Sequence, residues 1–134
     1  MRLLTELDLL DPDWYVARYP DVGAVDAGDH YRTVGWRQGR DPHPAFDTDW
    51  YLAAYPEARR ADIDPVTHFV REGCAADLRP NPLFDPAWYR AHYPESTGWQ
   101  PFAHYLIEGR FRGLHPGPAV ADAAAQADPA DRAE

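Results

Sequence analysis

A pattern of acidic, aromatic and proline residues occurs three times along this chain and constrains its fold more than any other feature. Successive Trp residues of the pattern are 36 and 38 positions apart, and each Gly follows its His by five positions. The pattern comprises Asp11, Asp47 and Asp85; Trp14, Trp50 and Trp88; Tyr19, Tyr55 and Tyr93; His30, His68 and His104; Gly35, Gly73 and Gly109; and Pro42, Pro80 and Pro116. Such self-similarity indicates a tandem repeat in which each copy is one supersecondary unit.

Helix-start and helix-stop residues predict two short helices in each copy. An Asp stands at the expected N-cap of the first helix, and in two copies Pro follows it at the first helical position. The Tyr-Pro pair ends this helix, because proline disfavours the α conformation in the residue before it. In the middle copy Asp64-Pro65 begins the second helix, and Gly73 is expected just past its end in a left-handed conformation.

These signals predict an all-α fold of three tandem two-helix repeats in a short solenoid-like stack. The segment after Pro118 is rich in Ala and has no periodic large apolar side chains, which favours a disordered tail or linker. The expected organisation is an N-terminal lead-in at 1–10, one repeat domain at 11–118 with units 11–46, 47–84 and 85–118, and a disordered tail at 119–134.

Helical spacing predicts which aromatic side chains form the core. Tyr51 and Tyr55 are separated by four residues and therefore share one helix face, and Phe69 belongs to an apolar stripe on the second helix. We expect all three to be buried. The equivalent Trp14, Trp50 and Trp88 are also expected in the core, with stacking on sugar rings as the alternative, and small residues at Ala17, Ala53 and Ala91 are expected at helix contacts.

Composition limits the classes of partner and the location. The formal net charge is −9, which argues against nucleic-acid binding because that function needs a basic surface. All thirteen basic residues are Arg, and with abundant Ala, Pro and Asp this is typical of a GC-rich bacterial genome. No apolar run is long enough to span a membrane, and the first residues do not resemble a signal peptide. The expected location is the bacterial cytoplasm.

Two residue types invite a metal or catalytic interpretation. Asp-x-Asp at Asp11, Asp47 and Asp62 resembles the metal-binding motif of many glycosyltransferases, but helix capping explains the first two, and the third copy lacks the second acid. Equivalent histidines on packed helices lie about 8–10 Å apart, too far to share one zinc ion with bonds of about 2 Å. We therefore expect each His to pair locally, and we expect neither a metal nor a cofactor.

The remaining nucleophiles stand outside known catalytic motifs. Cys74 follows Gly73, and the other copies have Trp36 and Arg110 at its position, so no repeated partner activates it. Ser96 is the single serine and lies in no G-x-S-x-G sequence. The chain also lacks a P-loop, a dinucleotide-binding glycine motif and an H-E-x-x-H sequence. We expect no catalytic residues and no enzyme activity.

A binding surface is predicted where the copies differ. Trp36, Arg37 and Arg40 lie in the first Gly-x-x-x-Gly loop, and Trp99 likewise does not recur in the other copies. Trp and Arg contribute much of the binding energy at protein interfaces, and loops often carry binding residues. These four residues are therefore the predicted binding site for a protein partner or a glycan, although Trp36 could instead cover the adjacent repeat.

The repeated string resembles a bacterial repeat found beside glycosyltransferase and other polysaccharide-biosynthesis domains and in some large secreted repeat proteins. Phe46-Asp47, Phe84-Asp85 and the sequence 35–40 carry the resemblance, which extends from about Leu10 to Pro118. The resemblance implies a helical accessory module. Our primary expectation is a non-catalytic interaction or scaffold module in a polysaccharide or glycan context, and the alternative is a carbohydrate-binding module that uses exposed Trp, Tyr and Arg.

Overall fold

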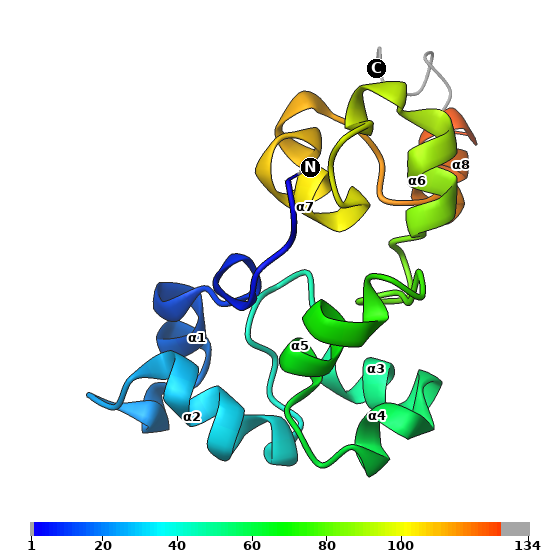
Figure 1. Ribbon diagram of the computed structural model, residues 1–134. Coiled ribbons are helices and arrows are strands. Elements are labelled where there is room, and N and C mark those ends of the chain that lie inside the picture. Colours follow the sequence, from blue (N-terminus) through cyan, green and yellow to red (C-terminus); the bar gives the residue numbers. More distant parts are fainter. Residues whose placement is uncertain (1, 127–134) are drawn as a thin grey trace. The chain divides into compact units, whose positions relative to one another are not determined.

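The computed structural model describes residues 2–126 and is built from short helices, with only isolated β-bridges in that range (Figure 1). The prediction of an all-helical protein is therefore confirmed. The α-helices are α1 (Pro12–Arg18), α2 (Ala27–Thr33), α3 (Thr48–Ala54), α4 (Pro56–Arg60), α5 (Pro65–His68), α6 (Pro86–His92), α7 (Pro101–Ile107) and α8 (Pro118–Gln126).

The chain forms two compact units, whereas the sequence predicted one repeat domain. One unit contains residues 4–81, and the other contains Met1–Leu3 together with Pro82–Glu134. The predicted lead-in belongs to both units. The Arg2 backbone exchanges hydrogen bonds of 2.8 Å with Gly98 and Gln100, whereas Leu9, in a 3-10 turn at Glu6–Leu9, is fully buried in the other unit.

The first helix of each of the three sequence segments begins and ends at the capping residues that the sequence predicted. Asp11, Asp47 and Asp85 each accept a hydrogen bond of 3.1 Å from the backbone N–H of the Trp three positions later. The Tyr before each Pro is the C-cap, and at all three positions its φ lies between −127° and −125° with ψ between 77° and 83°. Capping by Asp and blocking by Pro thus set helices of seven residues.

The second helices differ among the segments. α2 and α7 each continue into a 3-10 turn, at Gly35–Gln38 and Gly109–Arg112, whereas α5 continues into a π-helical turn at Phe69–Gly73. The middle segment also has two more residues between its Trp and His than the other two. They accompany α4, which stands where the other segments have three-residue 3-10 turns.

The role expected for the recurring glycines was wrong. Gly35, Gly73 and Gly109 do not have positive φ angles and are not left-handed helix caps. A Cβ at Gly35 or Gly109 would overlap the hydroxyl of Tyr15 or Tyr89, so these positions need glycine for close approach. The left-handed residues stand four positions later, where Gly39 and Gly113 have φ of 77° and 78° and Asp77 has 55°.

Backbone contacts close each segment on itself. The N–H groups of Asp11, Asp47 and Asp85 donate to the carbonyls of Pro42, Pro80 and Pro116 at 3.0, 3.1 and 2.9 Å. Phe84, directly before Asp85, packs in the segment that follows it, with its ring centre 5.3 Å from that of Tyr89. The Phe46 ring centre lies 5.3 Å from that of Tyr51 and 5.8 Å from that of Phe69, so Phe46 packs with the segment that follows it.

Burial departs from the sequence predictions at several positions. Tyr51 and Phe69 are buried as predicted, but Tyr55 is only half-buried, and its hydroxyl accepts a hydrogen bond from Arg79 N–H. Trp14, Trp50 and Trp88 are also half-buried, with the Tyr that ends each helix against their rings. The equivalent alanines Ala17, Ala53 and Ala91 are exposed, which does not agree with the expected positions at helix contacts.

The prediction of disorder after residue 118 was wrong for its first part, because α8 occupies Pro118–Gln126. Alanine has the highest helix propensity, and proline is compatible with a first helical position, so a helix forms without a strong apolar stripe. The rest of the predicted tail, 127–134, lies outside the described residues.

Candidate functional site

A polar surface cavity in the unit 4–81 contains two of the predicted binding residues. We call this cavity, which has a volume of about 230 Å³, the Trp36 pocket. Its lining residues are Trp36, Arg37, Asp49, Leu52, Arg59 and Asp62. Trp36 and Arg37 come from the 3-10 turn after α2, Asp49 and Leu52 from α3, and Arg59 from α4 (Figure 1). Asp62 follows α4 with a left-handed φ of 55°.

Trp36 is held firmly in the wall of this pocket. Its side chain is only 6% exposed, and its indole N–H donates a hydrogen bond of 3.1 Å to the carbonyl of Arg32. This burial agrees with the alternative that Trp36 packs on the protein and does not agree with an exposed aromatic. Its indole lies 4.4 Å from the guanidinium carbon of Arg37, within the range of a cation–π interaction.

The charged residues of the pocket fall into two pairs. Arg37 and Asp62 form an ion pair of 2.9 Å, and both side chains are more than half exposed. Among the described residues, neither Asp49 nor Arg59 has a side-chain hydrogen bond or an ion pair. The Asp49 carboxylate lies against Gly39, where an added Cβ would be 2.7 Å from Oδ1. The pocket thus offers a guanidinium donor and a carboxylate acceptor.

The other two predicted binding residues lie elsewhere. Arg40 does not line the pocket but forms a 2.7 Å ion pair with Asp21, and its guanidinium carbon lies 4.8 Å from the centre of the Tyr19 ring. Trp99 is half-buried in the other unit, where its ring meets His104 edge-on at 5.3 Å. Four pocket residues were not predicted as binding residues. Asp49 and Asp62 belong to Asp-x-Asp sequences, but Leu52 and Arg59 carry no sequence signal.

The three recurring histidines have local tyrosine partners. Nδ1 of His30, His68 and His104 is hydrogen-bonded to the hydroxyls of Tyr15, Tyr51 and Tyr89 at 2.7, 2.7 and 2.6 Å. In the middle segment Nε2 of His68 also lies 3.2 Å from a carboxylate oxygen of Glu72. A hydrogen bond from Nε2 to this carboxylate requires a proton on Nε2, and the neutral ring with that tautomer accepts the Tyr51 hydroxyl proton at Nδ1. Each tyrosine therefore fixes its histidine in place.

The remaining candidates for chemistry also lie in structural surroundings. Burial raises the pKa of the Cys74 thiol to about 12, which disfavours the nucleophilic thiolate near neutral pH. Ser96 is buried and donates a 2.7 Å hydrogen bond to the Tyr93 carbonyl. Within residues 2–126, no three His, Cys, Asp or Glu side chains lie close enough together to hold a metal ion.

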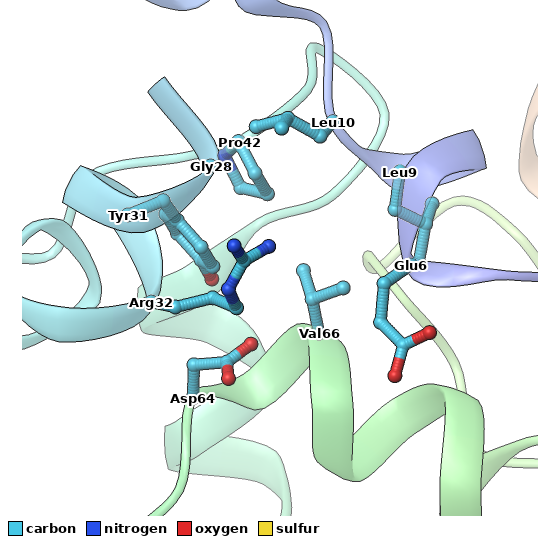
Figure 2. A pocket seen from close by; sticks show the side chains of 9 residues that line it. All are labelled: Glu6, Leu9, Leu10, Gly28, Tyr31, Arg32, Pro42, Asp64 and Val66. Carbon is cyan, nitrogen blue, oxygen red and sulfur yellow. The ribbon is translucent and has the colours of Figure 1, made fainter. Parts of the chain in front are cut away.

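A second hollow lies between the first two segments and is too small for a ligand. It encloses about 10 Å³, roughly the space of one water molecule. Figure 2 shows the Arg32 guanidinium between Tyr31 and Val66, with Leu9 and Leu10 on the far side. Tyr31 also makes a buried 2.8 Å hydrogen bond to Thr48, so this hollow is part of the packing between the segments.

Comparisons with protein-family models, with curated proteins and with solved structures found no match. In the described part of the chain, no helix combines the length and the apolar character needed to cross a lipid bilayer.

Proposed function

We propose that this chain is a non-catalytic helical interaction module that acts as a scaffold in bacterial polysaccharide or glycan biosynthesis, in the cytoplasm. The proposal includes a tandem arrangement of its three segments as copies of one two-helix repeat. The observation that carries it is the use of the recurring polar residues: the histidines bind tyrosines, and the aspartates cap helices. The residue types that would perform catalysis thus have structural roles.

Exposed apolar side chains support an interaction role. Phe111 is 73% exposed and lies next to Arg110, whose guanidinium carbon is 4.6 Å from the Phe111 ring centre. Ile107, four positions earlier, is also exposed. Aromatic and arginine side chains contribute much of the binding energy at protein interfaces.

The test is direct binding to a partner protein isolated with the immobilised chain and then purified separately. We expect Phe111→Ser to weaken this binding, whereas Val25→Ser, at an exposed apolar residue of the other unit, should leave it unchanged. Hydrolysis or transfer of a glycosyl group by the purified chain would contradict the proposal, and so would equal binding by both variants.

The second candidate is carbohydrate binding, and the Trp36 pocket is the observation that favours it. The pocket combines an indole, guanidinium groups and carboxylates in one cavity. A glycan array probed with the labelled chain tests this function. Binding to defined glycans supports it, and a blank array together with a confirmed protein partner rejects it.

A further inference from the structure

The Trp36 pocket has the size and the polar groups of a site for a single small ring. Its volume of about 230 Å³ is below the range of about 300–1,000 Å³ that is usual for drug-sized ligands. Its walls come from three consecutive parts of one unit, namely the turn after α2, helix α3 and the end of α4, and α3 contacts α4. The site therefore requires no partner subunit and no rearrangement between the units.

The hydrogen-bonding groups in the pocket match a ligand that both donates and accepts. Asp49 supplies carboxylate oxygens, which only accept, and Arg59 supplies guanidinium N–H groups, which only donate. A hydroxyl group does both, so two hydroxyls on one ring can satisfy Asp49 and Arg59 together. The Arg37–Asp62 pair adds another donor and another acceptor at the exposed edge of the pocket.

The charge of the pocket favours a neutral ligand. Two guanidinium groups and two carboxylates line it, so their formal charges cancel. A carboxylate ligand would meet the like charges of Asp49 and Asp62, and an ammonium ligand would meet those of Arg37 and Arg59. A neutral polyhydroxylated ring meets neither repulsion.

The pocket also has an apolar component. Leu52 and Trp36 line the same cavity as the charged side chains, but they are only 4% and 6% exposed and contribute a small apolar area. A pyranose ring has C–H groups as well as hydroxyl groups, so some of its C–H groups can contact this small apolar area.

We infer that the Trp36 pocket binds one neutral pyranose ring, with its hydroxyls hydrogen-bonded to Asp49 and Arg59. This inference rests on the carbohydrate-binding alternative of the proposed function. The ring is either a free monosaccharide or one residue of a longer glycan.

The experiment is an NMR titration of the full chain that follows the indole N–H of Trp36, assigned with Trp36→Phe. The neutral probes are glucose, galactose, mannose, N-acetylglucosamine and maltotriose, and the charged probes are glucuronate and glucosamine. At least one neutral sugar should shift the Trp36 signal and bind more tightly than its charged counterpart. Equal affinity for glucose and maltotriose would indicate one bound ring, and much tighter binding of maltotriose would indicate a glycan chain as the source.

Matched variants test the Trp36 pocket independently of the carbohydrate-binding function. Asp49→Asn and Arg59→Gln should each weaken sugar binding about tenfold, because each replaces a hydrogen bond to a charged group with a weaker one to a neutral amide. Asp13→Asn and Arg60→Gln are the controls. Asp13 is the equivalent of Asp49 in the first segment, Arg60 follows Arg59 in α4, and neither lines the pocket.

The outcomes are distinguishable. If the chain binds glycans on an array but Asp49→Asn and Arg59→Gln bind as tightly as the controls, the pocket assignment is overturned and the carbohydrate-binding function stands. A preference for glucuronate or for a glutamine-containing peptide also overturns the assignment. If neither the array nor the titration detects any sugar, the function and the site are both rejected.

Discussion

The hydroxyl of Tyr89 lies 2.6 Å from Nδ1 of His104, and both side chains are completely buried. Tyr15 with His30 and Tyr51 with His68 make the same hydrogen bond at 2.7 Å. Each bond connects the first helix of a segment to the second. The Tyr hydroxyl lies against the recurring glycine of that segment, where a Cβ would leave too little space for it. The Tyr–His pair and this glycine therefore act together, and both can be tested by substitution.

Substitutions at Tyr51 should separate hydrogen bonding from packing. Tyr51→Phe leaves the buried His68 Nδ1 without its partner and should lower the free energy of unfolding by about 1–3 kcal/mol. Tyr51→Ala also removes a fully buried ring and should cost about 3–5 kcal/mol. Denaturant unfolding measures both. Tyr15→Phe is the comparison and should lower the free energy of unfolding by less, because His30 is only half-buried. Equally small losses of stability for Tyr15→Ala, Tyr51→Ala and Tyr89→Ala would argue against a cooperative core.

Gly109→Ala should destabilise the protein through one specific contact. The added Cβ would overlap the Tyr89 hydroxyl, and overpacking of this kind costs about 1–3 kcal/mol. In a Tyr89→Phe background the overlapping oxygen is gone, so the same substitution should cost less. A double-mutant cycle measures the difference, and additive effects of the two substitutions would show that the glycine serves another purpose.

Asp77→Gly should stabilise the protein by about 1 kcal/mol, because Asp77 has a left-handed φ of 55° that glycine adopts without steric cost. The reciprocal change Gly113→Asp, at a φ of 78° with open space around the Cβ position, should destabilise by a similar amount. Thermal or denaturant unfolding tests both variants. A loss of stability in Asp77→Gly would show that contacts of the Asp77 side chain outweigh its backbone strain.

Alkaline pH should unfold the protein cooperatively. Burial raises the pKa of Tyr15, Tyr31, Tyr51, Tyr89 and Tyr105 above that of an exposed tyrosine. The unfolded chain loses these protons near pH 10, so the stabilisation is complete below about pH 10 and is lost as the pH rises further. Tyrosinate absorbance and helical circular dichroism should change together. Gradual ionisation with the helices intact would contradict the burial of these hydroxyls.

Cys74 should react slowly with a thiol reagent in the folded protein. Its pKa is raised to about 12 by burial, so little thiolate is present at pH 8, and the rate should increase with pH across the alkaline range in which the fold persists. In denaturant the thiol should react at the rate of an ordinary cysteine with a pKa of about 8.5. Rapid modification of the native protein at pH 7 would instead indicate an activated cysteine.

Local residue chemistry determined the first helix of each segment. Asp at the N-cap and Tyr-Pro at the C-terminus act over three or four positions, so the starts and ends of α1, α3 and α6 could be predicted from adjacent residues. The burial of Tyr51 and Phe69 also followed from helical spacing. The Ala-rich helix α8 was missed because the prediction required large apolar residues, although alanine itself favours helix.

Tertiary packing decided the features that depend on distant residues. The sequence could not show that Gly109 leaves room for the Tyr89 hydroxyl, because the two residues meet only when α6 packs against α7. Trp36 appeared free because its position varies among the copies, yet the turn after α2 buries it. Asp49 and Arg59 enter the same pocket as Trp36 because the turn and two helices converge there, and no local sequence rule encodes that convergence.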